Sequence, residues 1–126
     1  MALELTAIAI GATLGAWMRW ALSLWLNPRS PEFPLGTLAS NLIGGYLVGI
    51  AVAFFVARMD LPPVWRLFAI TGFLGGLTTF SSFSAEVTHL LLRGEYSSGL
   101  ALAATHLAGS LLLTAAGFAT YRAFAA

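Results

Sequence analysis

Two phenylalanines and an asparagine are the side chains of this sequence best suited to handle a small anion within apolar segments. Phe80 and Phe83 lie three residues apart and therefore share one face of a helix. The edge of an aromatic ring is positive, so rings presented edge-on replace part of the water around an anion. Asn41 adds two amide N–H donors. Because none of these groups carries a full charge, the anion would be held weakly enough to leave again, as conduction requires.

Each of these side chains also has a structural interpretation. A buried amide must find hydrogen-bond partners, so Asn41 either bridges helices or offers its amino group to an anion, and spacing alone does not decide between the two. Phenylalanines on a membrane helix usually face lipid or the core. Ser81 and Ser84 nevertheless form a row of hydroxyls beside the two rings, which disfavours a purely lipid-facing strip.

Further polar side chains lie inside apolar segments. Glu86 is an intramembrane carboxylate and hence a functional candidate, unless it pairs with an arginine as a structural link. His106, Ser110 and Thr114 are spaced four apart, so they share a helix face that must look inward or toward a second subunit. A lone histidine there is more readily explained as an interhelical hydrogen bonder than as a proton relay. Arg19 either anchors the membrane interface beside neighbouring tryptophans or attracts anions in a cationic vestibule.

Hydrolytic catalysis, thiol chemistry and nucleic-acid binding are poorly supported. No Ser/His/Asp set lies at a plausible common depth, no two carboxylates are near each other, and no metal-ligand cluster is present. The chain has no cysteine, and its net charge is only +1. We therefore expect a protein that is not an enzyme.

The composition is that of a membrane protein. With 59% hydrophobic and 9% charged residues, the 126-residue chain is far more apolar than a soluble domain, which has about 25% charged residues. Four segments reach the roughly 20 residues that cross a bilayer core: about Leu3 to Leu26, Leu35 to Arg58, Val64 to Leu92 and Ser97 to Phe124. The sequence predicts an all-α fold with one integral membrane domain over residues 1–126.

The third segment contains residues that disfavour a continuous helix. Gly72, Gly75 and Gly76 each cost roughly 1 kcal/mol relative to alanine, and Thr78 and Thr79 compete for backbone hydrogen bonds. We expect a break in mid-membrane near residues 75–79. Backbone freed at this depth must line a cavity or be buried in protein, and freed carbonyls suit a cation such as sodium.

The basic residues are all arginine and divide evenly between the two sides of a four-span chain. Arg58, Arg66 and Arg122 fall on one side, and Arg19, Arg29 and Arg93 toward the other. The positive-inside rule therefore gives no preferred orientation. This tie predicts dual topology, in which the chain inserts both ways and pairs antiparallel; a single orientation fixed by a partner is the alternative.

Several motifs together resemble those of the CrcB/Fluc family of bacterial fluoride channels. They are Gly72-Phe-x-Gly-Gly-x-Thr-Thr-Phe-Ser-x-Phe-Ser84, Gly36-Thr-Leu-x-x-Asn41, Gly15-x-x-x-Arg19 and Gly109-Ser110, and they cover all four segments. The resemblance implies a passive channel that exports fluoride across the bacterial inner membrane, built as an antiparallel dual-topology homodimer with two pores. The implied partners are fluoride, sodium, a second copy of the chain and the lipid bilayer, with no nucleic acid.

The resemblance also implies roles for individual residues. The implied fluoride pore is lined by Asn41, Phe80, Phe83, Ser110 and Thr114. A polar track beside it comprises Thr37, Ser81, Ser84 and Glu86, and Arg19 lies in the vestibule. The main-chain carbonyls of Gly75 and Thr78 from both subunits would hold a structural sodium ion.

Two positions depart from the family pattern, and two other functions stay open. Ala12 replaces a second glycine, which affects packing only, and His106 stands where Tyr or Asn is expected, so its part in the pore is unassigned. One alternative is a proton-coupled exporter of the small multidrug resistance type, although that class needs a deep carboxylate in its first span, where Glu4 lies at the extreme end. The other is a non-transporting membrane assembly protein, which gives no reason for a broken, hydroxyl-rich third span.

Overall fold

Four long apolar helical passes make up the whole chain. The computed structural model describes residues 1–126 and contains helices and connecting turns only. The first pass is α1 (Ala2–Leu26), extended by a short 3₁₀ turn η1 (Asn27–Arg29); the second is α2 (Leu35–Ala57) and the fourth is α6 (Tyr96–Ala125). With the third pass, Pro63–Leu92, each is long and apolar enough to cross a membrane. The prediction of an all-helical chain with four apolar spans is confirmed at this level.

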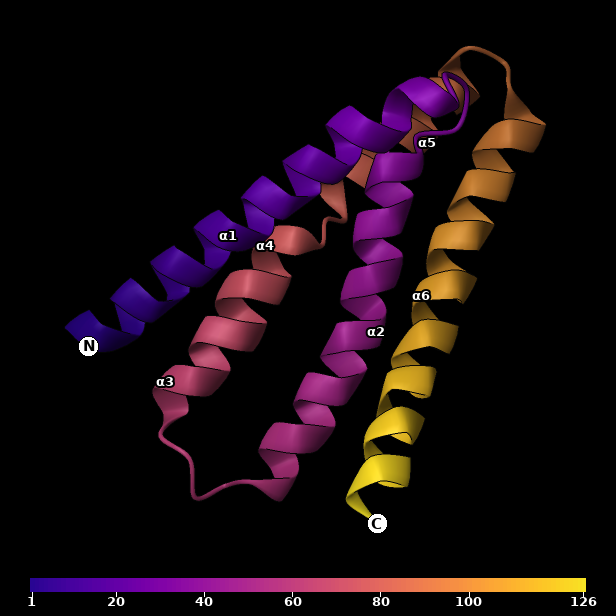
Figure 1. Cartoon of the computed structure of the whole chain (residues 1–126). Helices are drawn as coiled ribbons and strands as arrows, with labels where there is room; N and C mark the ends of the chain where they lie inside the picture. The colour runs from indigo at the N-terminus through magenta and orange to yellow at the C-terminus, as the bar shows by residue number, and fades with distance from the viewer.

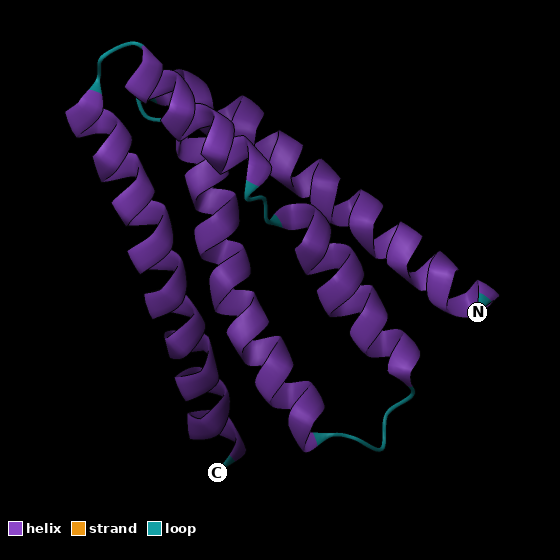
Figure 2. Cartoon of the chain, turned by 180° about the vertical axis from the view of Figure 1, so that it is seen from behind, coloured by secondary structure: helices purple, strands orange, loops and turns teal.

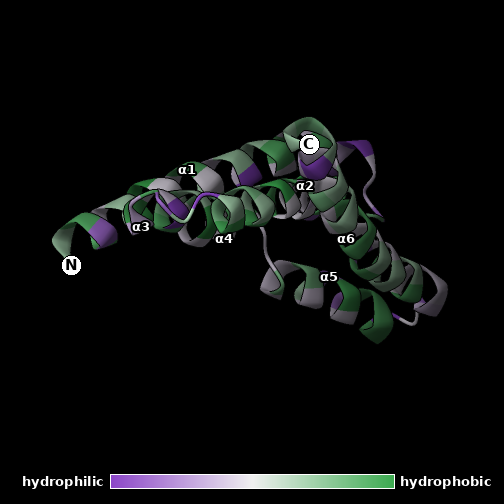
Figure 3. Ribbon diagram, turned by 90° about the horizontal axis from the view of Figure 1, so that it is seen from below, coloured by the Kyte–Doolittle hydropathy of each residue, from purple (hydrophilic) through white to green (hydrophobic).

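The third pass is built from several pieces. It begins with α3 (Pro63–Arg66), continues as the π-helical stretch η2 (Leu67–Leu74) and the single turn α4 (Gly75–Leu77), and resumes as α5 (Ser81–Leu92). Between α4 and α5, Thr78 takes an extended conformation with φ −89° and ψ 153°. Figure 2 shows this non-helical connection, and Figure 3 shows that α5 leaves the line of α3 and α4 and lies toward α6.

Glycines allow two pairs of passes to pack backbone against backbone. A Cβ placed on Gly72 would lie 3.1 Å from the Cα of Gly11 in α1, and one placed on Gly49 would lie 3.1 Å from the Cα of Gly117 in α6. Spacing this close leaves no room for a side chain, as in other membrane helix pairs with small residues at the contact. The first pass is therefore held tightly to the third, and α2 to α6.

The turns gather at two ends of the molecule. Figure 1 places both termini and the turn after α2 toward one end, and the two other turns at the opposite end. In the turn after α2, Arg58 Nε lies 3.1 Å from Asp60 Oδ1. The hydrogen bond from the Arg58 guanidinium lowers the pKa of the Asp60 carboxyl. At the other end, the Gly36 N–H donates to Asn27 Oδ1 over 2.8 Å, which satisfies one of the free N–H groups at the start of α2.

Candidate functional site

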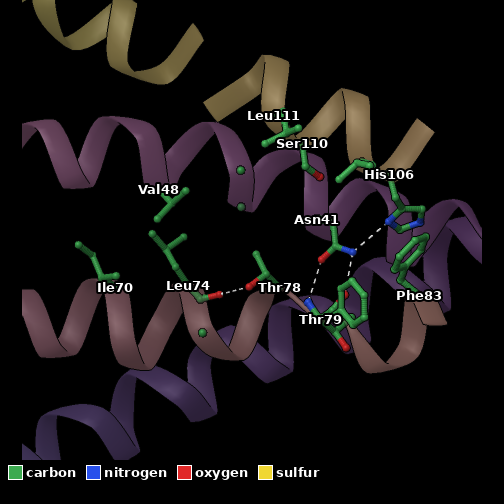
Figure 4. Close-up of a pocket in the computed structure, with 15 residues that line it drawn as sticks. Asn41, Val48, Ile70, Leu74, Thr78, Thr79, Phe83, His106, Ser110 and Leu111 are labelled. Atoms are coloured by element: carbon green, nitrogen blue, oxygen red, sulfur yellow. Dashed lines mark hydrogen bonds between the residues drawn. The ribbon is translucent and has the colours of Figure 1, made fainter. Parts of the chain in front are cut away.

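A cavity of about 440 Å³ lies between α2, the third pass and α6. Figure 4 shows polar and aromatic side chains from all three passes pointing into it. Seven of the candidate site residues named from the sequence line this cavity: Asn41, Gly75, Thr78, Phe80, Phe83, His106 and Ser110. Six others are not among the lining residues: Arg19, Thr37, Ser81, Ser84, Glu86 and Thr114.

Asn41 binds the backbone at the point where the third pass leaves the helix. Its Oδ1 accepts the Thr79 N–H over 2.8 Å, and its Nδ2 donates to the Thr79 carbonyl over 2.9 Å. One side-chain amide thus pairs with both polar groups of Thr79. In a continuous helix the Thr79 N–H would bond to the Gly75 carbonyl, so this pairing takes the usual donor away from Gly75. Asn41 bridges two passes in this structure, which is one of the two interpretations that the sequence left open.

Next to Thr79, some backbone carbonyls keep hydrogen-bond partners and others leave the helical pattern. The Thr78 N–H and hydroxyl both donate to the Leu74 carbonyl, over 3.0 and 2.8 Å. The ψ of 153° at Thr78 turns its own carbonyl away from the helical direction. The carbonyls of Gly75 and Thr78 are therefore both removed from the regular helical ladder, and both residues line the cavity.

Arg19 belongs to α1, its side chain reaches α4, and it is not among the residues that line the cavity. Its Nε donates to the Gly76 carbonyl over 3.0 Å. This carbonyl belongs to the last turn before the interruption, where carbonyls lack helical partners and a positive charge is favourable. Arg19 therefore supports the interrupted third pass from α1. The structure adds this backbone contact to the two interpretations, interface anchor and vestibule, that the sequence offered.

Thr79 is a site residue that sequence analysis noted only as part of the predicted break. Its hydroxyl accepts the Ser82 N–H over 3.1 Å and lies 3.3 Å from the Ser81 hydroxyl oxygen. A threonine that bonds the N–H three residues later caps a helix start. The signal for this role was a threonine placed shortly before a helical segment, since its hydroxyl can accept a backbone N–H at the helix start.

The aromatic rings in the cavity form a short stack. Phe80 and Phe83 meet edge to face, with ring centroids 5.4 Å apart and an interplanar angle of 72°. Phe83 lies in turn against the His106 ring, with centroids 4.4 Å apart and an angle of 32°. Phe80 is 78% exposed in the isolated chain, whereas His106 is buried. The Phe80 ring is therefore free to contact a further molecule.

The residues outside the cavity link passes to one another or lie on the surface. The Thr37 hydroxyl donates to Glu86 Oε1 over 2.5 Å, which connects α2 to α5. The Thr114 hydroxyl donates to the Gly45 carbonyl over 2.9 Å, which connects α6 to α2. Ser81 and Ser84 are exposed on α5. The structure thus brings Asn41, the two rings and Ser110 together at the cavity. The residues of the predicted polar track lie outside its lining, on α2 (Thr37) and on α5, the helix that also carries Phe83 (Ser81, Ser84 and Glu86).

The cavity is lined by hydroxyl groups, the positive rims of rings and the Asn41 amide, whose Nδ2 already contacts Thr79 and His106, and none of its lining residues is Arg, Lys, Asp or Glu. Partial charges attract an anion without trapping it. The chemistry of the cavity is therefore that of a weak site for a small, partly dehydrated anion.

Comparisons with known proteins agree with this chemistry. The family model described as "CrcB-like protein, Camphor Resistance (CrcB)" matches residues 6–118. A relative from Cupriavidus metallidurans is 58% identical over 94% of both chains, and one from Burkholderia pseudomallei is 59% identical over 98% of this chain and 96% of its own. A third, from Ralstonia pickettii, is 57% identical over 94% of both chains. All three carry the name "Fluoride-specific ion channel FluC".

Proposed function

This chain belongs to the CrcB family, and from that premise we propose that it is a multi-pass membrane protein that conducts fluoride passively. The observation that carries this function is the identity of 57–59% with fluoride-specific channels along almost the full length of both chains. The cavity supports it, because its hydroxyls and ring edges suit a small anion and none of its lining residues carries a carboxylate that would repel one. Passive export across the bacterial inner membrane is the role we assign to this conduction.

A flux assay in liposomes tests this function. Purified protein is reconstituted into vesicles loaded with fluoride, and efflux is followed with a fluoride electrode without any proton gradient. We expect rapid fluoride efflux and no comparable chloride efflux from matched vesicles. Efflux of cationic compounds that depends on a proton gradient would instead indicate an exporter of the small multidrug resistance type. The absence of any flux would indicate an assembly protein.

In the proposed pore, fluoride passes the edges of Phe80 and Phe83. Replacement of either ring by isoleucine keeps most of the apolar volume but removes the positive edge. We expect Phe80→Ile and Phe83→Ile each to lower fluoride efflux roughly three- to tenfold, which corresponds to about 0.5–1.5 kcal/mol for one aromatic contact. Phe54→Ile is the control, because Phe54 pairs with Phe55 outside the cavity. Normal efflux in both cavity variants would contradict a role for the ring edges.

The proposed assembly is an antiparallel homodimer whose two copies insert in opposite orientations. Three features support it: the even division of arginines between the two sides, the exposed Phe80 ring at the cavity and the exposed hydroxyls of Ser81 and Ser84 on a membrane helix. Polar groups on such a helix are stabilised by facing protein instead of lipid. A tag at the C-terminus should be accessible from both sides of sealed membrane vesicles, and a tag found wholly on one side would exclude dual topology.

Sodium is the proposed structural ion between the two copies, held by the main-chain carbonyls of Gly75 and Thr78. The residues fit such an ion, because Asn41 takes the usual donor of the Gly75 carbonyl and the extended Thr78 turns its carbonyl out of the helix. Hard cations prefer oxygen ligands, and irregular membrane backbone supplies carbonyls for sodium. The ion supplies positive charge that joins the two copies.

Replacing sodium should weaken the assembly. We expect exchange of sodium for a large organic cation, at constant ionic strength, to shift the detergent-solubilised protein from dimer toward monomer and to slow fluoride efflux. Size-exclusion chromatography with light scattering measures the first effect, and the liposome assay the second. Potassium and lithium serve as graded controls. If neither the fraction of dimer nor the fluoride efflux rate changed with the cation, the proposed structural sodium ion would be wrong.

A further inference from the structure

His106 occupies the remaining hydrogen-bonding position of Asn41. The Asn41 amide has two N–H donors, of which one points to the Thr79 carbonyl. Asn41 Nδ2 also lies 3.0 Å from His106 Nδ1. The Asn41 Oδ1 meanwhile accepts the Thr79 N–H. Figure 4 shows these three contacts converging on the one amide.

This geometry fixes which nitrogen of the His106 ring carries the proton. The Oδ1 of Asn41 must face the Thr79 N–H, so its Nδ2 is the atom that faces the imidazole. Because Nδ2 is a donor only, His106 Nδ1 must be the acceptor and carry no proton. The ring is then neutral with its proton on Nε2. The opposite tautomer, or a doubly protonated ring, would place two donors face to face.

The same ring also supports the aromatic part of the cavity. His106 is 3% exposed, and its ring lies against Phe83 at a centroid distance of 4.4 Å. A buried ring held on two sides has little rotational freedom. His106 therefore contacts both an amide and an aromatic ring that face the cavity, although it lies on a different pass from either.

We infer that His106 is a positioning residue of the pore, which holds the Asn41 amide in one orientation by accepting its second N–H at Nδ1 in the Nε2-protonated tautomer. This inference rests on the proposed function, because it concerns the conduction of fluoride past Asn41. Without this acceptor, one N–H of Asn41 loses its partner, and the amide is held by Thr79 alone. The stacking on Phe83 keeps the imidazole in place for this purpose.

Two substitutions separate the acceptor from the ring. His106→Asn puts an amide oxygen at the same number of bonds from Cβ as Nδ1, so it retains an acceptor but loses the ring. His106→Phe retains a ring that stacks on Phe83 but has no acceptor. We expect His106→Phe to lower fluoride efflux roughly fivefold, which corresponds to about 1 kcal/mol for one lost hydrogen bond, and His106→Asn to restore efflux to within about twofold of the original protein.

Nitrogen NMR provides a measurement that is independent of fluoride. The chain has only two histidines, and His89 is exposed on α5, so a His89→Gln sample assigns both in ¹⁵N-histidine-labelled protein. Two-bond ¹H–¹⁵N correlations at neutral pH should show that His106 carries its proton on Nε2. The side-chain amide of Asn41 should exchange its protons with water faster in His106→Phe than in His106→Asn.

The outcomes distinguish this inference from the function on which it rests. If the original protein fails to move fluoride, the proposed function is wrong, whereas the NMR result still tests the hydrogen bond. If the original protein conducts and His106→Phe conducts equally well while folding as a dimer, the positioning role is wrong. A proton on Nδ1, or a His106→Asn variant that is more impaired than His106→Phe, would also overturn it.

Discussion

Asn41→Asp should reduce fluoride efflux by two to three orders of magnitude while leaving the helices in place. The substitution keeps the size of the side chain but replaces a neutral donor with a carboxylate that faces the cavity. A negative charge about 4 Å from a passing anion opposes it by roughly 4 kcal/mol at an intermediate dielectric, which is about a thousandfold in rate. The carboxylate also has no N–H, so it cannot donate to the Thr79 carbonyl or to His106.

Asn41→Ser is the matched control for the charge. The serine side chain is too short to form the two hydrogen bonds that the Asn41 amide makes with Thr79, and it adds no charge. We expect its efflux to fall by roughly tenfold, well short of the loss in Asn41→Asp. Initial efflux rates per reconstituted protein, with circular dichroism to verify helix content, give the comparison. Equal rates for Asn41→Asp and the original protein would remove Asn41 from the ion path and leave it only the bridging role.

The four apolar passes were predictable because hydropathy and length act locally. Each pass needs about 20 apolar residues, and prolines at the turns mark where helices begin, as Pro63 does at the first position of α3. For the packing of the passes, the sequence predicted that helices would pack closely but not which helices would pair. The sequence indicated close glycine packing, but which helix each glycine contacts depends on the tertiary arrangement.

The position of the interruption in the third pass shows why local propensity was insufficient. Gly75 and Gly76 are helical in α4, and the chain leaves the helix at Thr78. A Cβ on Gly76 would lie 3.1 Å from the Cα of Ala12, so this glycine serves the contact with α1. The extended conformation falls instead on a β-branched residue, which accepts it readily. Tertiary packing thus decides which residue of the glycine and threonine run leaves the helix.

The hydrogen bonds of the site could not be predicted from sequence, because they join residues far apart in the chain. Asn41 and Thr79 are 38 residues apart, and Asn41 and His106 are 65 apart. The sequence named Asn41 and His106 as polar side chains that need partners, but it could not pair them. It also gave no sign that Arg19 would reach the Gly76 carbonyl. Such contacts depend on helix rotation and depth, which composition and spacing leave free.

Gly49→Leu should prevent the chain from folding in the membrane. A Cβ on Gly49 would lie 3.0 Å from the Phe118 nitrogen and 3.1 Å from the Gly117 Cα. These are backbone atoms of α6, which have no side-chain torsion through which to move aside. Overpacking of a core costs about 1–3 kcal/mol where side chains can adjust, so a leucine against backbone should exceed this range. Because α2 carries Asn41 and α6 carries His106, separating these helices also takes the cavity apart.

Gly75→Leu is the matched control for the same change of volume. A Cβ on Gly75 meets only the Ile70 carbonyl oxygen at 3.6 Å, an ordinary contact distance, and the main-chain carbonyl of residue 75 is retained. We expect Gly75→Leu to yield folded chains in detergent, counted as monomer and dimer together because residue 75 lies between the proposed copies, and Gly49→Leu to yield almost none, as judged by monodisperse peaks on size-exclusion chromatography. Gly49→Ala should fall between them, with a lower unfolding temperature. If Gly49→Leu were recovered as well as Gly75→Leu, α2 and α6 would have to pack through a different face, and the hydrogen bond between Asn41 and His106 would lose its structural basis.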